Sequence, residues 1–171
     1  MADVYWAADD DVLVVEKDGR WGYVDRSGSL IIPCKYDSAT QFLGNYACVS
    51  KTSGGTVDYY IIDKNGKTVV GPKDYEVIPW RDGFFIGRKG SSHALLDGNG
   101  SQVTDFAYRS IDNCGEGFFV VSVTDGKSFF QGLIDKNGTE IVPLDFDFVA
   151  ALSEAKYLVS GGGAIGLLTL P

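Results

Sequence analysis

The feature of this sequence that most constrains its fold is a motif that occurs four times. Each copy has two or three apolar residues, an aspartate, two variable residues and a glycine, followed by a second apolar run; the aspartates are Asp25, Asp63, Asp97 and Asp135. Their spacings of 38, 34 and 38 residues lie in the range of known repeat architectures. A fifth, incomplete copy follows near the C-terminal end, with Thr169 in the place of the aspartate.

Aromatic residues keep the same period. One aromatic follows each aspartate after 11 or 12 residues and a second after 21 or 22; these residues are Tyr36, Tyr75, Tyr108 and Phe146, then Tyr46, Phe84, Phe118 and Tyr157. Large aromatic side chains bury much apolar area when they are packed. We therefore expect core positions to recur along with the turns.

Each unit is expected to be β structure. The segment "VLVVEKDGRWGYVD" contains two apolar runs around an Asp18-Gly19 reversal, and residues 25–28 then turn the chain into "SLIIP", where a β-branched run ends at a proline. This pattern predicts a meander of three strands, followed by a connector or a short fourth strand. No segment has the periodicity of an amphipathic helix.

The sequence therefore predicts an all-β fold of about five tandem antiparallel hairpin or meander units in a single domain, residues 1–171. The first and last units are incomplete in complementary ways, which favours propeller-like or barrel-like closure. An open β solenoid is the alternative. Two hairpins are about four residues longer than their neighbours, and their tips, at residues 53–55 and 125–127, are expected to protrude.

Charge and cysteine content limit the function classes. The 171 residues include 15 Lys and Arg against 23 Asp and Glu, a net charge of −8, which opposes binding to nucleic acids and to anionic membranes and favours a basic protein partner. Cys34, Cys48 and Cys114 lack the spacing of a disulfide framework or a zinc site, so we expect a reducing, cytoplasmic setting. The sequence has no signal-peptide pattern and no run of 18 apolar residues.

Several residues invite a chemical interpretation that their context does not support. The Asp-x-x-Gly turns resemble the start of a cation loop, but each offers a single carboxylate, whereas turn formation uses both the aspartate and the glycine. His93 lies close to Ser91, Ser92 and Asp97 in the sequence, but neighbouring strand residues alternate faces, so we expect a structural histidine. Asp145 and Asp147 alternate with apolar residues, as on a half-exposed strand. We predict no catalytic residues, no metal and no cofactor.

The first complete unit, "GRWGYVDRSGSLIIPCKYDSATQF", resembles the WG-containing repeat family of bacterial proteins, and "QGLIDKNGTEIVPLDFDFVAALS" is similar, with Gln131 in the place of the tryptophan. The two middle copies carry Tyr59-Tyr60 and His93-Ala94 instead of Trp-Gly. The resemblance implies a structure-forming repeat without a common catalytic motif, used for binding or scaffolding. Trp21 is accordingly predicted to be a packing residue.

Residues that do not follow the repeat are the better candidates for a site. In a meander, the connector junctions and the Asp-x-x-Gly turns share one edge, where we predict partner binding by Asp9, Asp10, Asp11, Arg81, Asp82, Glu116 and Glu154. The predicted function is a non-enzymatic immunity or inhibitor protein that neutralises a basic bacterial toxin or effector domain. The alternative is glycan binding by aromatic residues such as Trp80, Phe129 and Phe130.

Overall fold

The structure, a computed structural model, describes residues 3–4, 11–153 and 156–169. These residues form antiparallel β-sheets, and their only helical element is a single 3-10 turn, η1 (Arg81–Gly83). The prediction of an all-β fold built from hairpin units is confirmed. Closure of the array and a single domain over 1–171 stay predictions. Within the described ranges, no helix has the length and apolar character needed to cross a membrane.

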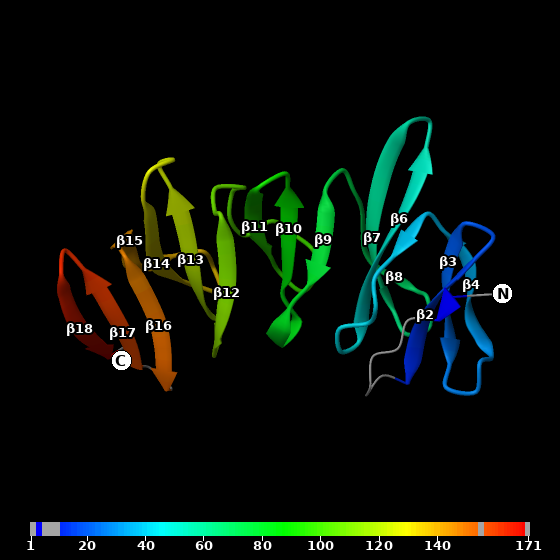
Figure 1. The fold of residues 1–171 in the computed structure, drawn as a ribbon, viewed down its shortest axis with the longest axis horizontal. Coiled ribbons are helices and arrows are strands. Elements are labelled where there is room, and N and C mark those ends of the chain that lie inside the picture. Colours follow the sequence, from blue (N-terminus) through cyan, green and yellow to red (C-terminus); the bar gives the residue numbers. More distant parts are fainter. Residues whose placement is uncertain (1–2, 5–10, 154–155, 170–171) are drawn as a thin grey trace. The chain divides into compact units, whose positions relative to one another are not determined.

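The chain forms two compact units, Met1–Trp80 and Arg81–Pro171. The first unit contains two four-stranded sheets, each with its strands in sequence order (Figure 1). The strands of the first sheet are β1 (Asp3–Val4), β2 (Val12–Lys17), β3 (Arg20–Asp25) and β4 (Leu30–Tyr36). Those of the second are β5 (Ser38–Ala39), β6 (Tyr46–Ser53), β7 (Thr56–Asp63) and β8 (Thr68–Lys73), and β9 (Glu76–Pro79) ends the unit.

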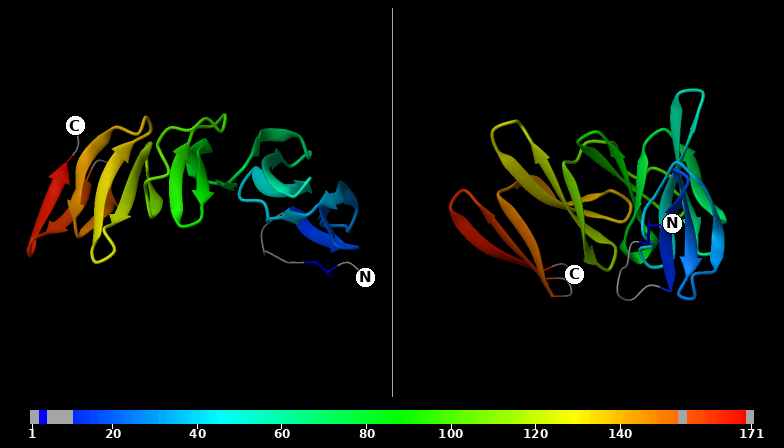
Figure 2. Two further views of the ribbon diagram at one scale, coloured as in Figure 1. Left: turned by 90° about the horizontal axis from the view of Figure 1, so that it is seen from above. Right: turned by 45° about the vertical axis from the view of Figure 1, so that its right-hand side comes forward.

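The second unit continues the same plan. It begins with η1 and the hairpin of β10 (Phe85–Lys89) and β11 (Ser92–Leu96). A four-stranded sheet follows, with β12 (Ser110–Gly115), β13 (Phe118–Thr124), β14 (Phe129–Asp135) and β15 (Glu140–Phe146). The last sheet has three strands, β16 (Phe148–Ser153), β17 (Lys156–Gly161) and β18 (Ala164–Thr169), and in Figure 2 the red β17–β18 hairpin continues this sheet from β16.

The predicted short fourth strand is present as the first strand of each four-stranded sheet, for example β5, which pairs with β6. The predicted third strand is missing from the third copy. There, residues 101–108 form only isolated bridges, between Leu96 and Gln102 and between His93 and Tyr108. The physical reason is local composition, because "SQVTD" stands where other units have a β-branched run such as "SLIIP".

The long β6–β7 hairpin confirms the prediction of a projecting tip. Its strands have eight residues each, against six in β2 and β3, and its tip extends beyond β8 of the same sheet (Figure 1). Gly54 and Gly55 both have positive φ, at 58° and 86°, as a tight reversal between two strands requires. The added residues lengthen both strands without changing which face is buried.

The recurring apolar residues form the cores between neighbouring sheets. In the first unit, Tyr23, Ile32 and Val49 belong to one cluster that joins the two sheets. In the second, Val120, Leu133 and Val149 belong to a cluster that joins the last two sheets. The periodic aromatics are all buried or half-buried, and Tyr36, Tyr75 and Tyr157 are no more than 8% exposed. Trp21 packs on the first cluster as a partly buried residue.

The glycine of the repeated strand allows a neighbouring backbone to cross close to it. A Cβ atom on Gly22 would lie 2.6 Å from the carbonyl oxygen of Ile32 in β4, and one on Gly132 would lie 2.6 Å from that of Val142 in β15. The strand pairing shifts register at both glycines. Glycine is therefore required at these positions by space rather than by backbone conformation.

Candidate functional site

The four Asp-x-x-Gly segments are self-contained turns. In each, one oxygen of the aspartate accepts hydrogen bonds from the backbone amides two and four residues later; for Asp135 the donors are Asn137 and Thr139, both at 2.8 Å. The same pair of bonds forms at Asp25, Asp63 and Asp97. The glycines have positive φ between 75° and 83°. The interpretation as turns is confirmed.

These bonds also set the charge of the turns. The hydrogen bond from the Ser27 hydroxyl, together with the Ser29 and Ser27 amides, holds the pKa of Asp25 below its ordinary value. Asp25 therefore stays ionised at neutral pH and directs one oxygen into its own turn. In the part of the chain that the structure describes, no three His, Cys, Asp or Glu side chains gather as ligands for a metal ion. The lack of a metal or cofactor remains a prediction.

Connector junctions and Asp-x-x-Gly turns lie side by side, as predicted for the candidate edge. In the first unit, Asp11 forms an ion pair with Arg26 of the turn at 3.0 Å, with both side chains well exposed. In the second unit, the Glu116-Gly117 turn lies against Lys136, since a Cβ atom on Gly117 would come within 3.4 Å of the Lys136 side chain. The edge geometry is thus present in both units.

The remaining predicted edge residues are placed as follows. Arg81 and Asp82 are exposed in η1, which adjoins the next turn because the Gly83 carbonyl oxygen would lie 3.1 Å from a Cβ atom on Gly98. Asp9, Asp10 and Glu154 fall outside the described residues. That this edge binds a partner stays a prediction.

The residues that invited a catalytic interpretation occupy structural positions. His93 exchanges backbone hydrogen bonds with Tyr108, and its buried Nδ1 atom has no hydrogen-bond partner. The carboxylate of Asp97 is bound within its own turn. Burial raises the pKa of the Cys48 thiol to about 11, which keeps it protonated and unreactive at neutral pH. Asp145 and Asp147 are exposed and alternate with half-buried residues, as expected.

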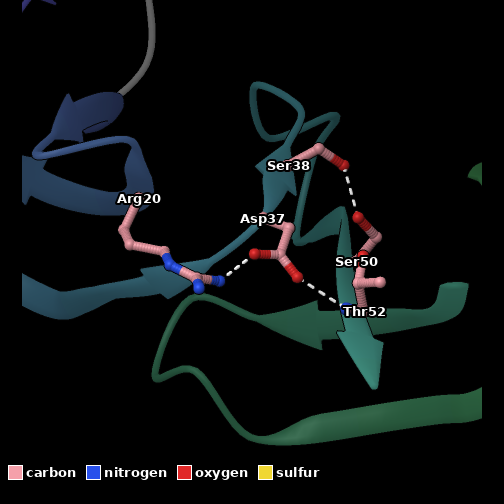
Figure 3. Close-up of polar contacts among 5 residues, drawn as sticks. All are labelled: Arg20, Asp37, Ser38, Ser50 and Thr52. Carbon is pink, nitrogen blue, oxygen red and sulfur yellow. Dashed lines mark hydrogen bonds and ion pairs between the residues drawn. The ribbon is translucent and has the colours of Figure 1, made fainter. Parts of the chain in front are cut away.

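A polar cluster that sequence reasoning missed lies beside β6 in the first unit (Figure 3). Asp37 receives an ion pair from Arg20 through one oxygen, and its other oxygen accepts a hydrogen bond from the Thr52 amide at 2.5 Å. Next to it, the hydroxyl groups of Ser38 and Ser50 are 2.7 Å apart. The cluster joins three strands, because Arg20 lies on β3, Asp37 precedes β5, and Thr52 lies on β6.

The second unit contains the counterpart of this cluster 72 residues later in the chain. Its hydroxyl pair is Ser110 and Ser122, again 2.7 Å apart. The backbone matches too, since the amide of Arg109 donates to the Ser122 carbonyl at 2.7 Å, as that of Asp37 does to Ser50 at 2.9 Å. The charged residues differ, and the space is an open polar hollow of about 170 Å³ lined by Ser91, Ser92, Ala107, Tyr108, Arg109 and Thr124.

The signal for this hollow was present in the repeat. The residue directly after the first periodic aromatic is acidic in three units, as Asp37, Glu76 and Asp147, and basic only in the third, as Arg109. Aligning the units by their aromatics as well as by their turns would have singled out Arg109. Its neighbours Ser92 and Thr124 could not be found in this way, because their proximity depends on strand pairing.

The comparisons with known proteins bear on the family and the fold. The sequence profile described as "WG containing repeat" matches residues 21–53 and 132–163, which cover the glycine-crossing strand and the hydroxyl-bearing connector. The chain thus matches the WG containing repeat family. The resemblance inferred from the two best-preserved copies is confirmed at those segments, and the protein is a β-repeat module.

Solved structures give a likeness of fold. A crystal structure of a eukaryotic initiation factor has a TM-score of 0.55 and 11% identity, covering 99% of this chain and 52% of that one. The AfRom2 CNH domain has a TM-score of 0.44 and 14% identity, covering 98% of this chain and 66% of that one. The chain therefore spans about half the length of the first of these structures. No curated relative matches its sequence.

Proposed function

We propose that this WG-type repeat protein is a non-enzymatic protein-binding module of the bacterial cytoplasm, and that it acts as an immunity or inhibitor protein against a basic toxin or effector domain. The observation that carries the proposal is the surplus of eight negative charges on a β-repeat scaffold. A surface of this sign attracts a basic partner over a distance of about 10 Å at moderate salt and raises the association rate.

The candidate edge supports the proposal because its charged groups do not follow the repeat. The turn aspartates are engaged in their own backbone amides, whereas Asp82 and Glu116 are exposed on irregular junctions. Asp82 and Glu116 both have positive φ, at 57° and 55°, where glycine is favoured over other residues. An acidic side chain at such a position is consistent with selection for binding rather than for folding.

A cytoplasmic location is supported by the cysteines. Cys34, Cys48 and Cys114 are all free thiols. Disulfides form and persist in oxidising compartments, so three unpaired cysteines suit a reducing one. The proposed partner would then meet the protein inside the cell that makes it.

The test is capture of a partner from the source cells at low salt, with charge reversal at the edge. The edge variant is Asp82→Lys with Glu116→Lys, and the control is Asp112→Lys with Asp145→Lys, which changes the net charge equally on exposed strand positions of the same unit. We expect a basic protein to be captured by the wild type and the control and lost by the edge variant. Equal loss in both variants would overturn the edge, and capture of no protein would overturn the function.

Glycan binding is the second candidate, because one of its predicted aromatics is open to solvent. Phe129, near the tip of the β13–β14 hairpin, is 61% exposed. Phe130 and Trp80 are half-buried, so they offer less surface for stacking on a sugar. This function predicts affinity that does not change with salt and a loss of binding in Phe129→Ala. Binding to the protein partner should be unchanged in that variant if the first proposal holds.

A further inference from the structure

The carboxylate of Asp37 completes a polar site within the first unit. It accepts from the Arg20 guanidinium on one side and from the Thr52 amide on the other (Figure 3). Both donors are directed at a single carboxylate group, which is the arrangement that charge-assisted hydrogen bonding favours. Arg20 is 53% exposed and Asp37 is 28% exposed, so the site is at the surface.

The corresponding site in the second unit keeps donors but loses the acid. Ser92 replaces Arg20, Arg109 replaces Asp37, and Thr124 retains the place of Thr52. On β13 the Ser122 carbonyl accepts from the Arg109 amide, and Thr124 lies two residues further along the same strand. Backbone groups two residues apart in a strand point to the same edge, so the Thr124 amide faces the hollow.

The hollow therefore presents a guanidinium, an amide and hydroxyl groups without a carboxylate between them. Among the described residues, Arg109 has no ion-pair partner. The acid that follows Thr124, Asp125, accepts hydrogen bonds from the Lys127 and Ser128 amides of its own hairpin at 2.8 and 2.7 Å. Lys89, paired in register with Ser92, adds a second cation near the rim.

We propose that this hollow is a binding site for a carboxylate presented by another peptide chain, as an aspartate or glutamate side chain or a C-terminus. The external carboxylate takes the place that an acidic residue of the chain itself holds in the other three units. Arg109 binds one of its oxygens, and the Thr124 amide, with the hydroxyls of Ser92 and Tyr108, binds the other. The proposal stands apart from the acidic edge and does not depend on the nature of the toxin.

The test is an NMR titration of the full chain that follows the Thr124 amide and the Arg109 side chain. The probes are acetate, a short end-blocked peptide with one glutamate, the same peptide with glutamine, and inorganic phosphate. We expect acetate and the glutamate peptide to shift both resonances saturably and the glutamine peptide to leave them in place. Arg109→Gln should weaken binding by at least about tenfold, whereas Arg26→Gln, at an exposed arginine of the other unit, should change it less than about twofold.

Each alternative outcome has a defined meaning. Binding of acetate without the glutamate peptide would overturn the proposal that a peptide chain supplies the carboxylate. A larger response to phosphate would overturn the choice of ligand, and shifts no larger than those of distant amides would overturn the site. The variant Ser92→Arg with Arg109→Asp recreates the pair of the first unit, so it should fold as the wild type does and lose the acetate response; a retained response would contradict the proposal.

Discussion

Replacing Gly22 by alanine tests whether a close strand crossing holds each repeat unit together. The new Cβ would lie 2.6 Å from the Ile32 carbonyl oxygen and 2.7 Å from the Cys34 amide nitrogen. Both neighbours are backbone atoms of β4, so relief requires that β4 move away from β3. Overpacking of this kind costs about 1–3 kcal/mol, and a clash with backbone belongs at the upper end.

The matched control is Gly166, which has the equivalent place in the incomplete last unit. A Cβ atom there would meet only a side-chain atom of Val159, at 3.5 Å, which is ordinary van der Waals contact. Alanine at this position should be neutral or stabilising by up to about 1 kcal/mol, because it restricts the unfolded chain. The same change in sequence is thus expected to have opposite effects at two copies of one motif.

The assay is thermal and urea unfolding followed by circular dichroism. At about 2–4 °C per kcal/mol for a chain of this size, Gly22→Ala should lower Tm by about 6–12 °C, while Gly166→Ala should leave it unchanged or raise it slightly. Gly132→Ala should behave as Gly22→Ala, since it faces the Val142 oxygen at 2.6 Å. If Gly22→Ala and Gly166→Ala have the same effect on Tm, the crossing does not explain the glycine.

Two further predictions concern burial and the turns. Because burial raises the pKa of Cys48 from 9.0 to about 11, its contribution to the free energy of unfolding is complete below about pH 9 and is lost as pH rises towards 11, by up to roughly 3 kcal/mol. Urea unfolding between pH 8 and 10 should therefore show a shallower decline for Cys48→Val, and equal slopes would contradict this. Asp135→Ala, which removes the acceptor for two amides, should cost about 1–2 kcal/mol, whereas Asp135→Asn and added calcium should change stability little. A calcium-dependent rise in Tm for the wild type would restore the cation interpretation of the turn.

The sequence predicts this fold as far as local chemistry determines it. The Asp-x-x-Gly turns depend on residues within five positions of one another, and the glycine crossing follows from the spacing of one motif, so both were predictable. The missing third strand of the third copy shows the limit, because "SQVTD" keeps the apolar spacing too weakly to form a ladder. The turn preceding it is intact and gave no warning.

The candidate sites divide in the same way. Asp82 and Glu116 were placed at the junctions by their position between strands, and the structure has them there. The Arg109 hollow was missed because Ser92, Arg109 and Thr124 come from segments 15 or more residues apart, which only the pairing of β12 with β13 and the bridge from His93 to Tyr108 bring together. In Gln131 the structure gives a repeat position a different use, since its side chain accepts from the Val149 amide at 2.8 Å where another unit has a tryptophan.

The central claim is that the protein binds a basic protein partner through its acidic surface, and the salt dependence of partner capture tests this most directly. Capture from the source cells should return one basic protein at about 50 mM salt, and the amount should fall by about tenfold or more at 0.5 M, where the screening length is below 10 Å. Capture that does not change over this range, or that returns neutral sugars in place of a protein, would contradict the account.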